Sequence, residues 1–149
     1  MVGKVEEYLL REIQERGAIH ITLIDPEKAN SESVSHFARE VESCKSSAIM
    51  IGGTTLVSST QLDEVVRAVK GSVSIPVILF PNNITGISKY ADAIWFMSLL
   101  NSSDPYFITG AQVLGAPLIK KYSLEPISLG YVIVGEGGSA GVIGRAFSI

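Results

Sequence analysis

The chain has 149 residues, the length of one typical domain. Its hydrophobic content of 46% and charged content of 18% exclude a disordered protein. A net charge of −3 without a basic block argues against a nucleic-acid partner, and no apolar run reaches the roughly 20 residues that cross a bilayer. The single cysteine, Cys44, allows no internal disulfide, so we expect a cytoplasmic protein in which Cys44 is a packing residue.

Predicted strands and helices alternate along the chain. Apolar residues at helical spacing predict a first helix over residues 5–16, which Gly17 ends. Short apolar runs then predict five buried strands, at residues 18–24, 48–51, 75–80, 92–100 and 127–134. We expect helices between them at residues 33–44, 59–70, 87–90 and 104–122. Ser31 or Ser33 is expected to cap the first of these, and Pro117 to break the last.

This alternation indicates an α/β protein with a parallel sheet, because parallel strands need crossover connections. A doubly wound sheet and a (β/α)8 barrel both satisfy the pattern. In both folds ligands bind at the carboxyl ends of the strands, so the residues that follow each predicted strand form the candidate site. Small, polar and acidic residues gather there, at residues 25–28, 52–55, 81–83, 98–103 and 135–144.

Asp25 is the only carboxylate directly at a strand end in the first half of the chain. A carboxylate there suits Mg²⁺, which takes oxygen ligands and commonly binds substrate phosphates as well. A hydroxyl from Thr54 or Thr55, one strand over, could add a ligand. The alternative is that Asp25 only caps the following turn. Zinc is not expected, because neither histidine has a partner at metal-ligand spacing.

The glycine-rich loop after the fifth predicted strand contains a near match to a dinucleotide-binding motif, Gly135-x-Gly137-x-x-Ala140. That motif needs a helix beginning at its last small residue and an acidic residue about 20 positions further on. Another glycine stands where the helix should be, and no acidic residue follows. We therefore do not expect a dinucleotide site.

Four stretches of the sequence form a specific set through their order and spacing: "HITLIDPEK", "IMIGGTT", "VILFPNN" and "YVIVGEGGSAGVIG". Together they resemble the geranylgeranylglyceryl phosphate synthases, archaeal (β/α)8-barrel prenyltransferases related to the bacterial PcrB proteins. The resemblance covers essentially the whole chain. It implies a reaction that joins the C3 hydroxyl of sn-glycerol 1-phosphate to the geranylgeranyl group of geranylgeranyl diphosphate. Pyrophosphate is released, the product belongs to archaeal ether-lipid synthesis, and Mg²⁺ is the implied cofactor.

The resemblance also implies roles for individual residues. Asp25 and Thr54 match the Mg²⁺ positions, which makes Asp25 part of the catalytic site. The implied glycerol-phosphate segment comprises Tyr131, Val132, Ile133, Val134, Gly135, Glu136, Gly137 and Gly138, in which the last two glycines would present backbone N–H groups. Glu136 would take the proton of the glycerol hydroxyl. It stands one residue later than the acidic residue of the family pattern Y-x-x-V-E-P-G-G, and in an extended segment such a shift turns the side chain to the other face.

The prenyl chain needs an apolar groove, and aromatic residues surround the fourth predicted strand. For Trp95 and Phe96 we favour ordinary packing between strand and helix. Tyr106 and Phe107, which follow a loop, are the better candidates for the groove.

The family barrel has eight strands, and five are predicted here. We therefore expect residues 1–149 to be a single domain, the N-terminal part of a protein of roughly 240 residues. We expect a homo-oligomer without a transmembrane segment, and peripheral membrane contact stays open. Two other functions stay open: a phosphate-binding barrel enzyme that acts on a sugar phosphate, and a non-enzymatic chain, either an open sheet that assembles with another chain or an inactive fragment.

Overall fold

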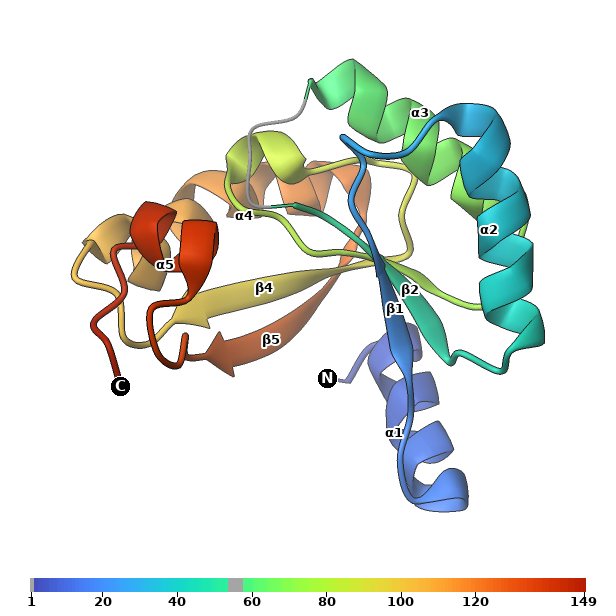
Figure 1. Ribbon diagram of the computed structural model, residues 1–149, viewed down its shortest axis with the longest axis horizontal. Helices are drawn as coiled ribbons and strands as arrows, with labels where there is room; N and C mark the ends of the chain where they lie inside the picture. Colours follow the sequence, from blue (N-terminus) through green and yellow to red (C-terminus); the bar gives the residue numbers. More distant parts are fainter. Residues whose placement is uncertain (1, 54–57) are drawn as a thin grey trace.

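The computed structural model describes residues 2–53 and 58–149. Helices and strands alternate along the chain (Figure 1). The elements are α1 (Lys4–Arg16), β1 (Ile21–Ile24), α2 (Ser31–Ser43), β2 (Ala48–Ile51), α3 (Ser59–Lys70), β3 (Val77–Leu79), the 3₁₀ turn η1 (Ile84–Gly86), β4 (Ala93–Leu99), the π-helical turn η2 (Tyr106–Gly110), α4 (Ala111–Tyr122), β5 (Glu125–Tyr131) and α5 (Gly138–Ile143). No helix of the described residues is long and apolar enough to span a membrane.

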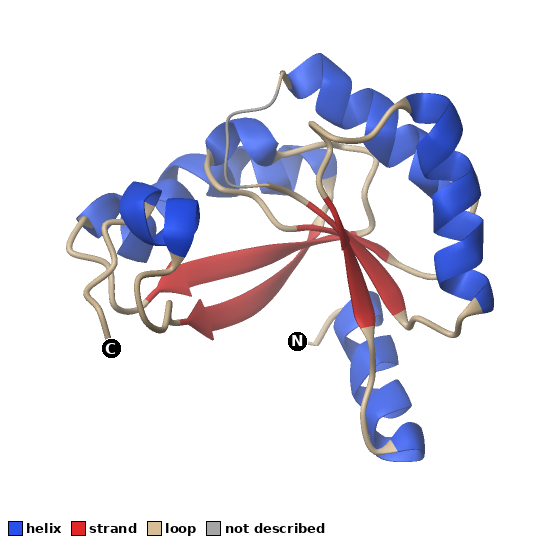
Figure 2. Cartoon of the chain, viewed as in Figure 1, coloured by secondary structure: helices blue, strands red, loops and turns tan. Residues whose placement is uncertain are grey.

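The five strands form one parallel sheet in the order β1-β2-β3-β4-β5. Each strand therefore pairs with the strand before it in the sequence, and the order never reverses. A doubly wound sheet reverses its order at a switch point, whereas a (β/α)8 barrel does not. Figure 2 shows the strands fanning out from one another, as the strong twist of a barrel wall requires. The strand order thus decides between the two predicted folds.

The larger core lies between the sheet and helices α2, α3 and α4. Side chains that alternate along the strands meet the apolar faces of these helices, so burial rather than helix propensity holds the layer together. The buried members of this core are Ile24, Val34, Ala38, Val41, Ile49, Ile51, Leu62, Val65, Val66, Val69, Val77, Leu79, Ile94, Ile119 and Leu124.

The opposite face of the sheet is closed at one end by α1. Val5 and Leu9 of this helix pack in a second cluster whose buried strand residues are Ala48, Ile78, Ala93 and Ile127. Most of these strand residues lie at or near the starts of their strands, so α1 covers the amino-terminal end of this face. The carboxyl end of the same face holds the second of the two pockets described below, whereas the first lies between the sheet and α4.

Several local predictions are wrong. Asn30, not Ser31 or Ser33, caps α2, because its side chain accepts the Ser33 N–H at 2.8 Å. Pro117 lies inside α4, which continues to Tyr122 without the predicted break. Buried Gly115 and Ile119 on either side of the proline hold the helix against the core.

Other differences concern segment ends and burial. The helix predicted at residues 87–90 is absent from this described part of the chain, where η1 at residues 84–86 replaces it. Its cap is Asn83, whose side chain accepts the Thr85 N–H at 2.7 Å. Cys44 is exposed rather than packed, since it follows the last turn of α2. Leu23, predicted to be buried, is 50% exposed because it lies at the carboxyl end of the sheet face that α1 covers only at the other end.

Candidate active site

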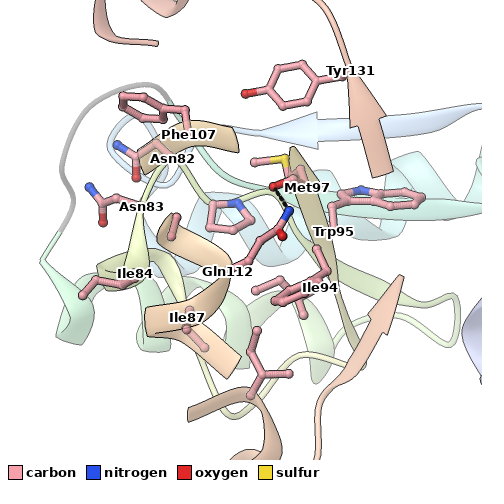
Figure 3. A pocket seen from close by; sticks show the side chains of 15 residues that line it. Asn82, Asn83, Ile84, Ile87, Ile94, Trp95, Met97, Phe107, Gln112 and Tyr131 are labelled. Atoms are coloured by element: carbon pink, nitrogen blue, oxygen red, sulfur yellow. Dashed lines mark hydrogen bonds between the residues drawn. The ribbon is translucent and has the colours of Figure 1, made fainter. Parts of the chain in front are cut away.

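The carboxyl ends of the strands converge on two adjoining pockets. The first pocket lies between β4, η1 and α4, and its side chains are drawn in Figure 3. The second lies across the ends of β1, β2 and β3 and reaches the segment that follows β5. Both pockets share Pro81, Asn82, Met97, Phe107 and Tyr131. Three of the five strand-end stretches predicted from sequence, at residues 52–53, 81–83 and 135–144, therefore contribute to one site with two lobes.

Apolar side chains dominate the lining of both lobes. Ile87, Ile94 and Trp95 line the first, while Leu23 and Ile133 line the second. Among the described lining residues there is no lysine or arginine. A site of this kind suits a hydrocarbon chain, and polar groups at its rim would fix the orientation of a ligand.

Phe107 stands at the junction of the two lobes because η2 is pinned to β4. The Ser98 hydroxyl donates to the carbonyl of Ile108 at 2.7 Å, and Gln112 Nε2 donates to the carbonyl of Met97 at 2.8 Å (Figure 3). A π-helical turn inserts an extra residue into a helix and is frequent at functional sites. Of the two aromatic residues favoured for the groove, Phe107 lines both lobes, whereas Tyr106 lines neither and packs edge-on against Phe107, with ring centroids 5.1 Å apart.

Tyr131, the last residue of β5, also lines both lobes. Its ring centroid lies 6.5 Å from that of Phe80, and Figure 3 shows its hydroxyl directed toward the side of the pocket where Phe107 and Asn82 lie. Burial raises the pKa of the Tyr131 hydroxyl above its ordinary value. The residue therefore presents a neutral hydroxyl to the pocket at physiological pH.

Asp25 directly follows β1, and its carboxylate lies beside the end of β2. Oδ1 accepts the Glu27 N–H at 3.1 Å, and Lys28 Nζ lies 3.4 Å from Oδ2. A Cβ atom at Gly53 would lie 2.9 Å from Oδ1, so only glycine leaves the carboxylate its present position. Gly53 in turn lines the second lobe. Asp25 thus caps its turn and also stands next to the pocket, so both sequence interpretations describe the same side chain.

Thr54 and Thr55, the hydroxyl residues predicted to join Asp25, lie outside the described residues. The described residues contain no group of three or more His, Cys, Asp or Glu side chains that could hold a metal ion. Any metal at Asp25 would therefore take its other ligands from hydroxyl, backbone, water or substrate oxygens.

The glycine-rich segment sends alternate side chains to opposite sides. Tyr131 and Ile133 line the second lobe, whereas Val132 and Val134 are 47% and 72% exposed. Glu136 is exposed and lines neither lobe. The predicted fifth strand ends at Tyr131 rather than at residue 134, so the alternation continues beyond the strand.

Three glycines of this segment have left-handed backbone, with φ of 68° at Gly135, 65° at Gly137 and 54° at Gly138. A side chain at Gly137 would also overlap the Ile133 side chain. A six-residue helix, α5, begins directly after Gly137. A short helix therefore does follow this loop, although a glycine stands where the dinucleotide motif would place one.

Sequence reasoning counted Ser98 and Asn101 among the strand-end candidates but gave them no role, and it missed Gln112. Asn101 is buried, Ser98 and Gln112 are half-buried, and nothing in their spacing distinguishes them from loop residues. Their role depends on carbonyl groups supplied by distant parts of the chain, which no local pattern reveals.

Fold and site together define the class: five consecutive βα units of a (β/α)8 barrel, with a largely apolar site at the carboxyl ends of the strands. The chain belongs to the PcrB family, whose model matches residues 10–149. This confirms the family resemblance that the sequence motifs indicated.

Named relatives agree with this assignment. The chain is 55% identical over 143 residues to the geranylgeranylglyceryl phosphate synthase of Thermofilum pendens, covering 96% of this chain and 56% of the relative. It is 52% identical over 145 residues to that of Pyrococcus furiosus, covering 97% of this chain and 57% of the relative. The chain thus spans little more than half the length of the curated relatives it matches.

Solved structures confirm the partial barrel. The wild-type GGGPS from Thermoplasma volcanium matches with a TM-score of 0.91 at 36% identity, over 98% of this chain and 58% of that chain. The (S)-3-O-geranylgeranylglyceryl phosphate synthase from Thermoplasma acidophilum, in complex with its substrate sn-glycerol-1-phosphate, matches with a TM-score of 0.90 at 36% identity, over 100% of this chain and 60% of that chain.

Proposed function

We propose that this chain forms the N-terminal βα units of a prenyltransferase that joins sn-glycerol 1-phosphate to geranylgeranyl diphosphate and releases pyrophosphate. The names of its relatives support the reaction. One observation in this chain carries the proposal: an apolar two-lobed pocket lies beside a carboxylate, with Gly53 contacting both. A prenyl diphosphate has the same two-part character, a long hydrocarbon joined to an anionic head that binds through a metal.

Residues at the end of β1 fit a Mg²⁺ ion of the kind that bridges to substrate phosphates. Such an ion is usually held by one or two carboxylates and keeps the rest of its ligands as water and phosphate oxygens. Asp25 supplies one carboxylate, and Gly53, which has no Cβ, leaves room for it beside the end of β2. We propose Asp25 and Thr54 as the protein ligands. When bound, the ion would neutralise negative charge that develops on the departing diphosphate.

Within the pocket, this chain would bind the hydrocarbon and exclude water from the reacting carbon. Phe107 and Tyr131 would contact the hydrocarbon of the substrate at the junction of the two lobes. Water exclusion matters because an allylic cation formed on ionisation reacts with any nearby water. An apolar wall that keeps water away would leave the glycerol hydroxyl as the nucleophile nearest to the cation.

Residues Tyr131 to Gly138 remain our proposal for the glycerol-phosphate segment. Its pocket-facing side chains, Tyr131 and Ile133, carry no positive charge, so contacts to the phosphate ester would come from the backbone N–H groups of Gly137 and Gly138. Glu136 is proposed as the group that accepts the hydroxyl proton, a role in which its exposed carboxylate would have to turn toward a glycerol phosphate bound against this segment. Replacing Glu136 with glutamine tests this role by itself. We expect kcat to fall roughly 100-fold, with little change in the KM for sn-glycerol 1-phosphate or for geranylgeranyl diphosphate. An unchanged kcat would remove Glu136 from the proposal and leave the rest intact.

The central experiment uses the complete protein with Mg²⁺, sn-glycerol 1-phosphate and geranylgeranyl diphosphate, and measures pyrophosphate release. Asp25→Asn keeps the shape of the side chain and removes its charge. We expect kcat to fall about 100-fold, which corresponds to a rise of about 2.7 kcal/mol in the activation barrier. Glu15→Gln is the matched control: it makes the same charge change at an exposed position on α1 and should leave kcat unchanged. Absence of pyrophosphate release by the wild-type protein would overturn the proposal.

We also propose a cytoplasmic homo-oligomer. A single cysteine in the sequence suits a reducing compartment. Self-association is supported by two apolar side chains on the outer surface of α4, Val113 and Leu114, which are 71% and 58% exposed. Sedimentation of the wild-type protein beside Leu114→Lys tests this: the variant should sediment as a smaller species.

A further inference from the structure

The pairing between β4 and β5 continues through a side chain beyond the point where the strands end. The backbone ladder stops at Leu99 and Tyr131. Two residues further along, the amide of Asn101 lies against the peptide of Ile133: Oδ1 accepts the Ile133 N–H at 3.0 Å, and Nδ2 donates to the Ile133 carbonyl at 2.8 Å. The side chain thus makes the two hydrogen bonds that the backbone of a neighbouring strand would make.

Asn101 also joins a third segment to this pair. Its side-chain Nδ2 donates to the carbonyl of Phe147 at 2.7 Å, and its backbone carbonyl accepts the Phe147 N–H at 2.7 Å. Asn101 is only 9% exposed, so water cannot readily replace these partners. A buried amide that loses them would leave several polar groups unpaired, which is costly. The amide therefore fixes the backbone of Ile133 in one position.

The position of Ile133 decides which side chains form the pocket wall. Residues 132–134 lie outside β5, yet Ile133 lines the second lobe while its neighbours Val132 and Val134 are exposed. An irregular segment has no backbone ladder to impose this alternation. The hydrogen bonds from Asn101 supply the missing constraint, because they hold the Ile133 peptide in the register that a longer strand would give.

We propose that Asn101 is a positioning residue for the prenyl substrate: by pairing with the Ile133 peptide, it holds Ile133 in the wall of the second lobe and so sets the affinity for the hydrocarbon chain. This inference rests on the proposed function. It assigns Asn101 no contact with substrate, and its effect passes through Ile133.

The test uses steady-state kinetics of the complete protein. Asn101→Asp keeps the size of the side chain but replaces the Nδ2 donor with an oxygen, which would face the carbonyl oxygens of Ile133 and Phe147. We expect the KM for geranylgeranyl diphosphate to rise about tenfold, while the KM for sn-glycerol 1-phosphate changes less than about twofold. Ser103→Ala is the matched control. Ser103 lines neither lobe, and its hydroxyl donates at 2.9 Å to the Arg145 carbonyl, a hydrogen bond that joins the segment after β4 to the segment after α5 away from Ile133. Both KM values of this control should stay at the wild-type level.

A double-mutant cycle separates positioning from general destabilisation. Ile133→Ala should itself raise the KM for geranylgeranyl diphosphate, and adding Asn101→Asp should raise it less than about twofold further, because the side chain that Asn101 positions is already gone. Effects that multiply in full, an equal rise in both KM values, or a wild-type KM in Asn101→Asp would each overturn the inference. If Asn101→Asp does not fold, the smaller and uncharged Asn101→Ser is assayed against the same criteria. A wild-type protein without turnover would instead overturn the proposed function, and this inference with it.

Discussion

The carboxylate of Glu125 caps the first helix, α1, although the two are about 120 residues apart in the sequence. Removing the charge of Glu125 should destabilise the protein. Glu125 begins β5, and its Oε2 accepts the Val5 N–H at 2.9 Å while its Oε1 accepts the Glu6 N–H at 2.8 Å. These N–H groups belong to the first turn of α1 and have no partner within the helix. The N-cap residue, Gly3, has no side chain to serve them.

The size of the effect follows from these two hydrogen bonds. Glu125→Gln keeps one acceptor, removes the charge that interacts with the helix dipole, and turns an NH₂ group toward the second N–H. Loss of a cap typically costs about 0.5–2 kcal/mol, and a hydrogen bond to a charged group contributes about 1.5–3 kcal/mol. We therefore expect the free energy of unfolding to fall by about 2 kcal/mol, and the Tm by roughly 4–8 °C for a domain of this size.

Urea and thermal denaturation followed by circular dichroism measure this loss. The matched control is Glu7→Gln, which removes the same charge from the same helical turn at an exposed position and should cost no more than about 0.5 kcal/mol. Gly3→Ala offers an independent route, because its new Cβ would overlap the Glu125 carboxyl group. Combining Gly3→Ala with Glu125→Gln should cost less than the sum of the two. Equal losses for Glu125→Gln and Glu7→Gln would refute the capping argument.

Three further predictions concern ionisable groups. Hydrogen bonds from the Ser74 hydroxyl and then the Ser74 N–H lower the pKa of Glu42, so its contribution to stability is present above the unfolded value and is lost as pH falls through the folded pKa; an NMR titration should show the Glu42 pKa rising in Ser74→Ala, and an unmoved value would contradict this. Burial raises the pKa of Tyr131, so its contribution to stability is complete below pH 10 and is lost as pH rises through the folded pKa; an ultraviolet titration should lose a late-ionising component in Tyr131→Phe, and an unchanged curve would count against it. Asp92 accepts from Lys70 at 2.7 Å in a partly buried pair, and Asp92→Asn should lower the free energy of unfolding by about 1–2 kcal/mol in urea denaturation; a loss below about 0.3 kcal/mol would show that the pair contributes little.

Strand and helix order was predictable because it depends on local apolar patterns. β2, α1 and α3 begin and end within one residue of the predicted positions. A clear apolar pattern marks each of them, and a glycine caps the end of both helices. Asp25 was predicted at the edge of the sheet because parallel strands place the residues that follow them at one edge. Tyr131 was named only through the family resemblance, since the predicted strand ran past it to residue 134. The errors fall where distant contacts act: α4 runs through Pro117, held by its packing against the core, and β5 ends where Asn101 takes over the pairing.

The sequence by itself determined that this is a parallel α/β protein of the PcrB family type, with its site at the carboxyl ends of the strands. These properties follow from the spacing of apolar residues and from four short motifs. Only the tertiary structure decided which side chains share the site. Phe107 enters both lobes and Tyr106 neither, although they are adjacent, because a π-helical turn pinned by Ser98 sets their directions. Ile133 faces the pocket because the buried amide of Asn101, 32 residues earlier, holds its backbone N–H and carbonyl. Glu136 does not face the pocket, and it lies between glycines with left-handed backbone.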